Sequence, residues 1–178
     1  MGMVKKYDSS GRLIHPEHDT IIEKIMIWLE EEKFSVERHD KETYSFSGVV
    51  IVGEEEFVNI LLPEGKCDHI IIYADTINFS GLFVALPEEV TKKFLYDLRI
   101  ALIHTHLLHK VHFDEENNLT GIQVRKLIYF DGLTKDRFFD IIYTILGAIE
   151  LVCVKYLQFK DSLFQYSTRQ YETNNIYK

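Results

Sequence analysis

Cysteine is scarce in this chain of 178 residues, since only Cys67 and Cys153 occur and neither belongs to a C-x-x-C pair. Two isolated thiols cannot build a disulfide framework, so we expect a reducing compartment, the cytoplasm. No apolar segment opens the sequence, and we therefore expect no secretory signal. The longest apolar run, residues 138–157, contains three charged side chains, each costing about 2.5–3.5 kcal/mol near the centre of a bilayer. We predict a buried helix there and no membrane association.

Basic residues are also fewer than acidic residues. The chain has 20 Lys and Arg against 28 Asp and Glu, which is a net charge of −8. The basic pairs Lys92-Lys93 and Arg125-Lys126 form no continuous stripe. Because an acidic protein repels a phosphate backbone, the composition argues against nucleic-acid binding.

The sequence lacks the motifs that cradle phosphates or expose a catalytic serine, namely G-x-x-x-x-G-K-[ST], G-x-G-x-x-G and G-x-S-x-G. The segment Cys67-Asp68-His69 places a thiol two residues from an imidazole. Neighbours at i and i+2 on a strand splay apart, so we interpret this segment as a turn that enters a strand. We expect no catalytic residue and no cofactor.

The chain is rich in apolar residues. Its hydrophobic fraction of 46% and charged fraction of 27% are those of a soluble globular protein. At this length one domain is the default. We predict an N-terminal extension over residues 1–16, a single domain over 17–159 and a polar C-terminal tail over 160–178.

The order of elements predicts an α+β fold. Short breaks between the first three strands require antiparallel neighbours, because a parallel crossover needs a dozen or more residues. Acidic and Asn residues at 116–118 predict a hairpin, and Thr134 is a candidate cap for the last helix. The predicted elements are a helix from residue 16 or 20 to 33, strands 44–52, 57–62 and 69–77, a helix 88–109, strands 111–115 and 120–130, and a helix to about 159. The order α-β-β-β-α-β-β-α describes an antiparallel sheet with packed helices.

The second predicted helix has two apolar sides. One side carries Phe94, Leu98, Ala101, Leu102 and Leu108 and suits the contact with the sheet. A surface helix should be polar on its other side, yet that side carries Tyr96, Ile100, Ile103 and Leu107. The second side is either additional core or an interface with a second copy or with a partner's apolar segment. We favour the interface.

Four histidines cluster at the end of the same predicted helix: His104, His106, His109 and His112. On a helix, the spacing i, i+3 would bring His106 near His109, whereas His104 and His106 would diverge. Imidazolium is also favoured at helix C-termini by the dipole, without any metal. We predict no metal site, and His106 and His109 are the candidates should one exist.

The element order and the long closing helix resemble the fold of class I type III secretion chaperones. Residues 128–136 (IYFDGLTKD) and 94–99 (FLYDLR) are similar to an uncharacterised, largely archaeal protein family near that fold. The resemblance implies a homodimer in which the second helix and nearby strands meet. It also implies apolar patches that hold an extended client segment.

We therefore predict a non-enzymatic, dimeric, chaperone-like module that binds proteins or peptides. The alternative is a small metal- or ligand-dependent enzyme or sensor that uses the cluster from His104 to His112.

Overall fold

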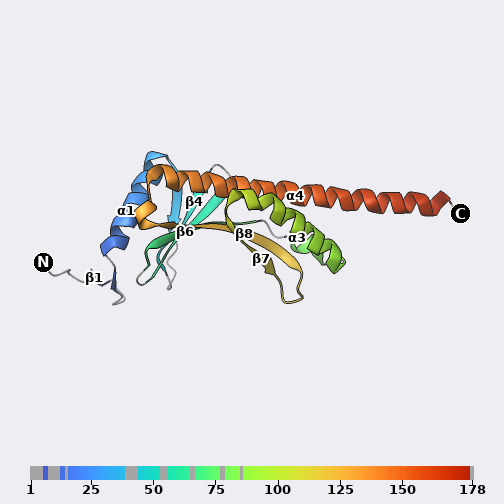
Figure 1. The fold of residues 1–178 in the computed structure, drawn as a ribbon, viewed down its shortest axis with the longest axis horizontal. Helices are drawn as coiled ribbons and strands as arrows, with labels where there is room; N and C mark the ends of the chain where they lie inside the picture. The colour runs from blue at the N-terminus through green and yellow to red at the C-terminus, as the bar shows by residue number, and fades with distance from the viewer. Residues whose placement is uncertain are drawn as a thin grey trace. The chain divides into compact units, whose positions relative to one another are not determined.

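The computed structural model describes residues 6–7, 13–14, 16–38, 44–52, 56–64, 67–76, 79–84 and 86–176. Its helices and strands are labelled in Figure 1. In chain order they are β1 (Lys6–Tyr7), β2 (Leu13–Ile14), α1 (Pro16–Glu31), β3 (Ser35–Arg38), β4 (Tyr44–Val52), β5 (Glu56–Pro63), β6 (His69–Asp75), α2 (Ser80–Phe83), α3 (Glu88–Leu102), a 3-10 turn (Ile103–Thr105), β7 (Leu108–Phe113), β8 (Leu119–Tyr129), a second 3-10 turn (Phe130–Gly132) and α4 (Lys135–Ile176).

The main sheet has six strands in the order β3-β4-β5-β6-β8-β7. Strands β3 to β6 pair antiparallel in succession. Strand β8 runs antiparallel to β6, because Phe130 donates to the carbonyl of Asp68 while Thr76 donates to that of Ile122. The predicted α+β fold with an antiparallel sheet and packed helices is confirmed.

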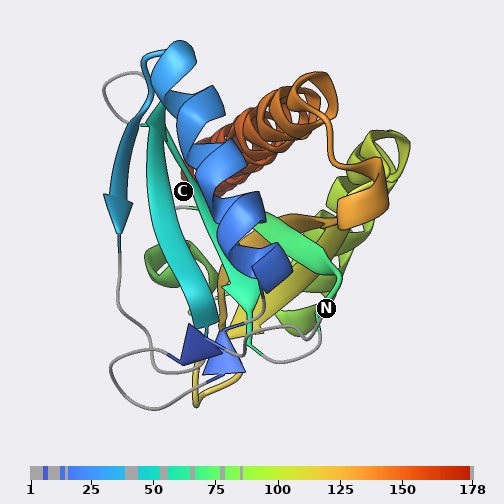
Figure 2. The same ribbon diagram turned by 90° about the vertical axis from the view of Figure 1, so that its left-hand side faces the viewer.

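The contacts divide the chain into two compact units. The first comprises Met1–Ala74 with Arg125–Leu146, and the second comprises Asp75–Val124 with Gly147–Lys178. In the first unit, α1 lies along the strands on one face of the sheet (Figure 2). Its Trp28 ring lies 5.9 Å from that of Phe138 at the start of α4. The core between them is mainly aliphatic and includes Ile25, Leu29, Val50, Ile60, Ile72 and Ile142.

The core of the second unit is rich in aromatic rings. Helix α3 runs beside the second half of α4 (Figure 1). Phe79 stacks on Tyr156 with ring centroids 4.6 Å apart, and Phe83 stacks on Phe159 at 5.6 Å. Phe94 of α3 contacts Phe159 at 4.9 Å. Offset and edge contacts of this kind stabilise a core beyond the area that they bury.

Helix α3 ends earlier than predicted, at Leu102 instead of His109. The hydroxyl of Thr105 donates to the carbonyl of Leu102 (2.7 Å) and accepts from the amide of Leu107 (3.3 Å). His106 then takes a left-handed conformation, with φ of 54°. These bonds satisfy the helix end without the Gly or Pro that usually marks it, so sequence reasoning extended the helix too far.

Helix α4 extends beyond its predicted end, through residue 160 and on to Ile176. Its start is as predicted, because the hydroxyl of Thr134 accepts a hydrogen bond from the amide of Arg137 (3.3 Å). Residues 160–176 are polar but contain no Gly or Pro. Polarity alone does not stop a helix, whereas Gly and Pro are the residues that disfavour one most strongly.

Several short elements were not predicted, namely strands β1, β2 and β3, helix α2 and the two 3-10 turns. Strand β3 has four residues and pairs with β4, and α2 is a single helical turn. Among the helices of the described residues, none combines the length and the apolar character that crossing a bilayer requires.

Candidate functional site

Helix α3 has two apolar sides, of which one is buried and the other exposed. Phe94, Leu98 and Leu102 are buried. On the other side, the exposed fractions are 65% for Tyr96, 51% for Ile100 and 63% for Ile103. Large apolar side chains that are this exposed and this close together are typical of interaction surfaces. We call Tyr96 and Ile100, together with Ile103 at the start of the following 3-10 turn, the outer face of α3.

The prediction placed Leu107 on the same helical face. The structure places it after the helix, between the 3-10 turn and β7, where it is half-buried. Leu108 was predicted to face the sheet from the helix, but it lies on β7 and is 53% exposed. Both errors follow from the early end of α3, because the left-handed backbone of His106 ends the helical periodicity before Leu107.

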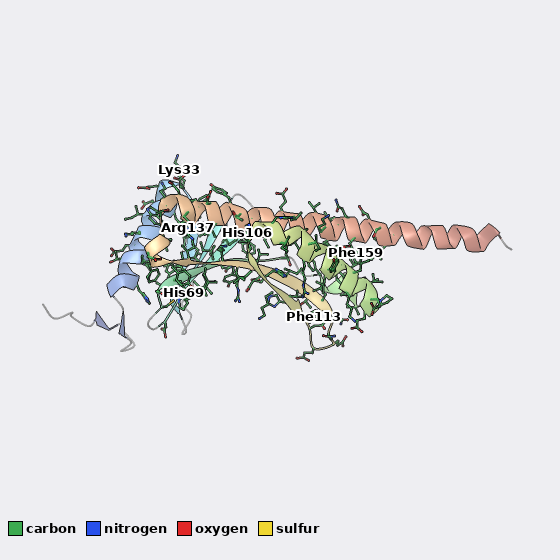
Figure 3. All side chains as sticks on the ribbon, viewed as in Figure 1. Lys33, His69, His106, Phe113, Arg137 and Phe159 are labelled. Atoms are coloured by element: carbon green, nitrogen blue, oxygen red, sulfur yellow. The ribbon has the colours of Figure 1, made fainter. Side chains whose placement is uncertain are left out.

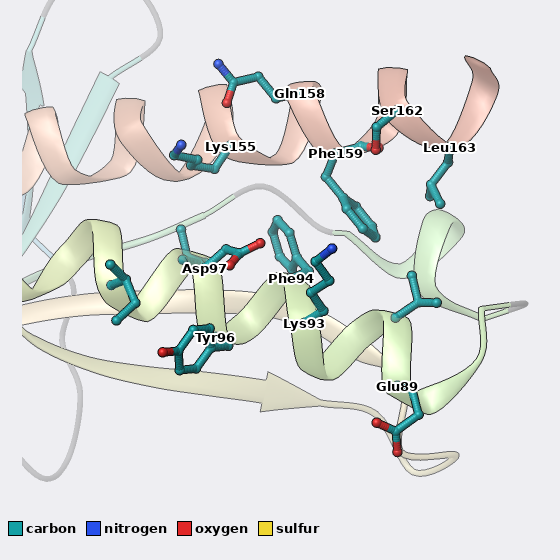
Figure 4. Close-up of a pocket in the computed structure, with 13 residues that line it drawn as sticks. Glu89, Lys93, Phe94, Tyr96, Asp97, Lys155, Gln158, Phe159, Ser162 and Leu163 are labelled. Carbon is teal, nitrogen blue, oxygen red and sulfur yellow. The ribbon is translucent and has the colours of Figure 1, made fainter. Parts of the chain in front are cut away.

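An open groove of about 1080 Å³ lies between α3 and the second half of α4, and Tyr96 and Ile100 of the outer face line it while Ile103 does not. Figure 4 shows Phe94 and Phe159 pointing toward each other from the two helices. Lys93 and Asp97 of α3 and Lys155 of α4 supply charge of both signs along the groove. The remaining lining residues are Glu89, Val90, Tyr96, Leu98, Ile100, Gln158, Ser162 and Leu163.

Sequence reasoning identified one wall of this groove and missed the other. The α4 residues that line it belong to a helix that is apolar on several sides, so periodicity could not tell which side would face α3. The polar tail was also expected to lie outside the domain, although Ser162 and Leu163 line the groove.

The histidine cluster is dispersed by the end of α3. His104 lies in the 3-10 turn, His106 follows it, and His109 and His112 lie on β7. His106 and His109 therefore do not share a helix face. Successive strand residues point to opposite sides of a sheet, so His109 and His112 also diverge. Within the described residues, no three His, Cys, Asp or Glu side chains are grouped so that they could hold a metal ion.

His112 instead lies beside Asp75, with 3.7 Å between its Nε2 and the carboxylate Oδ1. They line a shallow hollow of about 440 Å³ together with Thr76, Thr120 and Phe113. The Asp75 carboxylate also accepts from the Gln123 amide at 3.1 Å. The hollow is wide open and offers no enclosed site for a reacting group.

The thiol and imidazole of Cys67 and His69 do meet, contrary to prediction. The distance from Sγ to Nδ1 is 3.4 Å, and Cys67 lies before the first residue of β6. Asp68 Oδ1 lies 3.2 Å from the same Nδ1. A Cys-His-Asp triad needs the two ring nitrogens to serve different partners. One shared nitrogen does not provide that arrangement, and the thiol also donates to the His69 carbonyl at 3.1 Å.

A comparison with models of protein families shows to which family the chain belongs. A family model described as "Uncharacterized conserved protein (DUF2299)" matches residues 21–155. The chain belongs to this family. No match was found among curated proteins. The largely archaeal membership expected from the sequence stays a prediction.

The fold is similar to those of several solved structures. An uncharacterized protein from Methanothermobacter thermautotrophicus aligns with a TM-score of 0.68 and 29% identity, over 77% of this chain and 97% of that one. A chain of the ExsC-ExsE complex aligns at 0.40 and 19%, over 59% and 71%. YbjN from E. coli aligns at 0.37 and 12%, over 80% and 93%. The last two scores are too low for a conclusion about this chain.

Proposed function

We propose that this protein is a non-enzymatic module that binds segments of other polypeptides through the outer face of α3 and the adjoining groove. The observation that carries the proposal is the exposure of Tyr96, Ile100 and Ile103 beside a largely apolar hollow. Full burial of a side chain of this size contributes about 1.5–3 kcal/mol, so covering the exposed half of each contributes roughly 1 kcal/mol. A partner that covers all three gains about 3 kcal/mol, so a specific interaction also needs contacts along the groove.

The chemistry of the groove favours a polypeptide over a small polar metabolite. Its floor is made by rings and aliphatic side chains, while Lys93, Asp97 and Lys155 lie along it. Such a surface matches a segment that alternates apolar with charged residues. Protein interfaces combine an apolar centre with a polar rim in the same way.

The proposal extends to a chaperone-like role, a homodimer and a cytoplasmic location. The sequence resemblance to secretion chaperones supports the first two. The two cysteines are both free thiols, which suits a reducing compartment. The alternative, an enzyme or sensor built on His104–His112, gains no support from the positions of these residues on three different segments.

The test measures whether the outer face holds an unfolded polypeptide. Reduced α-lactalbumin aggregates in dithiothreitol, and it is acidic, so it has no charge attraction to a chain of net charge −8. We expect the full chain to delay its light scattering. The Ile100→Glu variant should need about tenfold more protein than wild type for the same delay, because it places a charge at the centre of the apolar face.

Val84→Glu is the matched control. Val84 is 56% exposed, against 51% for Ile100, and it does not line the groove. The control has the same change of charge and should act like wild type. The proposal fails if wild type leaves aggregation unchanged, or if the two variants lose the effect equally while circular dichroism shows both to be folded.

A further inference from the structure

Helix α4 has an exposed apolar surface on the side away from α3. Phe159 faces α3, where its ring lies 4.9 Å from that of Phe94. Leu157 precedes Phe159 by two residues, which is a rotation of about 200° around a helix. Figure 3 shows Phe159 on the side of α4 toward α3, and other side chains on the side away from it. Leu157 accordingly does not line the groove, and it is 54% exposed.

Exposed residues recur along that side of α4 with the spacing of a coiled coil. From residue 147 onward the steps are three, four, three, four and three residues, and every residue reached is exposed. With this heptad spacing one helix packs along another, each side chain fitting between side chains of the partner. The three large apolar residues in the series, Val154, Leu157 and Phe164, are 42%, 54% and 63% exposed. We define the α4 seam as the six residues Gly147, Glu150, Val154, Leu157, Asp161 and Phe164.

Gly147, the first residue of the seam, is an independent indication that another helix approaches here. A Gly inside a helix lowers its stability relative to Ala, because Gly loses more conformational freedom on folding. A Cβ atom added at residue 147 would meet no atom within 4 Å. Packing among the described residues therefore does not require glycine at this position, whereas the close approach of a partner's backbone would explain it.

Two acidic residues determine which kind of partner fits the seam. Glu150 and Asp161 occupy the second and the fifth of its six positions. Neither carboxylate forms an ion pair with a residue that the structure describes. A carboxylate covered by an apolar helix would lose its water without gaining a partner, which is costly. A helix that covers the seam therefore needs a Lys or Arg opposite each of the two acids.

The same two residues argue against a second copy of the chain as the occupant. Glu150 and Asp161 are placed symmetrically about the middle of the seam. A parallel second copy would place Glu150 opposite Glu150, and an antiparallel one would place Glu150 opposite Asp161. Because either arrangement buries like charges together, the partner must be a different polypeptide.

We propose that the α4 seam binds an amphipathic helix of another protein, in which two basic residues eleven positions apart interrupt an aliphatic stripe. Eleven residues of helix span about 16 Å, which matches the rise from Glu150 to Asp161 along α4. The symmetric placement of the acids allows the partner to run in either direction. This site is separate from the surface of the proposed function, because none of the seam residues lines the groove.

The first test compares two synthetic helical peptides of about 21 residues, or three heptads, that differ only in charge. One carries Leu at four seam-facing positions and Lys at the second and fifth, and the other has Glu in place of the two Lys. Like charges also oppose the pairing of each peptide with itself. In fluorescence anisotropy with the full chain, the Lys peptide should bind about tenfold tighter than the Glu peptide, because only Lys neutralises Glu150 and Asp161. A wild-type chain that binds neither peptide, or both equally, overturns the inference.

Charge reversal then separates local pairing from the general attraction of a chain of net charge −8. The double variant with Glu150→Lys and Asp161→Lys should prefer the Glu peptide. The matched control has Glu23→Lys and Glu30→Lys, which change the net charge equally at two exposed positions of α1. It should keep the wild-type preference for the Lys peptide. An unchanged preference in the seam variant, or an equal change in the control, overturns the inference.

The second test separates the seam from the groove. Leu157 and Ile100 are similarly exposed, at 54% and 51%, so neither substitution should unfold the chain, which circular dichroism checks. Leu157→Asn should weaken the binding of the Lys peptide about tenfold, because it removes an apolar contact in the middle of the seam. Ile100→Asn should leave this binding unchanged. Weakening by Ile100→Asn alone, or by both variants equally, overturns the inference and leaves intact the proposed function, which the aggregation assay tests separately.

Discussion

The two sides of helix α3 contain similar residues and have different surroundings. Phe94, Leu98 and Leu102 are buried, while Tyr96, Ile100 and Ile103 are exposed. In most surface helices the side away from the core is polar. Here both sides are apolar, so composition cannot tell which side contributes to folding and which to binding. Substitutions can separate the two contributions, because a core side chain affects stability and an exposed side chain affects association.

The largest effect should come from the buried side. Phe94→Ala removes a ring that contacts Phe79, Phe83 and Phe159 and leaves a cavity in the aromatic core. We expect a loss of about 3–5 kcal/mol in the free energy of unfolding, measured by urea denaturation. Ile100→Ala on the exposed side should stay within about 0.5 kcal/mol of wild type. Equal losses would mean that the outer face is part of the core.

An intermediate effect is expected where the helix ends. Thr105→Val keeps the shape of the side chain but loses both hydrogen bonds of its hydroxyl. We expect about 1–2 kcal/mol of destabilisation, because the Leu102 carbonyl loses its partner. Thr105→Ser retains the hydroxyl and should recover most of the stability. A valine variant as stable as wild type would show that the end of α3 is set by packing instead.

The smallest effect concerns the turn that follows β7. The Asp114 carboxylate accepts hydrogen bonds from the amides of Asn118 (2.8 Å) and Glu116 (3.0 Å). The bond from Asn118, the largest cause, lowers the pKa of Asp114 below its ordinary 3.8. A lowered pKa in the folded state stabilises the hairpin above pH 3.8, and this stabilisation is lost as the pH falls through the lowered value.

Amide hydrogen exchange of β7 and β8 measures this contribution. Protection of the wild-type hairpin amides should decrease as the Asp114 carboxylate is protonated in acid. In the Asp114→Ala variant, protection should already be lower at pH 6, and no carboxylate remains at this position to reduce it further. Converging protection of the two proteins at the lowest pH is the expected result. A wild-type hairpin whose protection stays constant with acid would show that the carboxylate has no role in the turn.

These cases show why some sequence predictions succeeded and others failed. The strands from Tyr44 to Asp75 were located to within about two residues, because β-branched runs and short turns are local signals. The cap of α4 at Thr134 was also predicted correctly, because it depends on residues only three positions apart. The end of α3 was misplaced because Thr105 supplies a hydrogen bond in place of the expected Gly or Pro. The contact between Cys67 and His69 was missed because it depends on where β6 begins.

The sequence by itself determined the element types, the α+β class and the presence of a second apolar side on α3. These properties follow from periodicity, which acts over a few residues. Tertiary structure alone decided that α3 and α4 enclose a groove which Tyr96 and Ile100 line, that Leu107 lies off the helix, and that β7 is an edge strand. Each of these depends on segments far apart in the chain. Their pairing is chosen by the total burial of many side chains, which no single stretch of sequence contains.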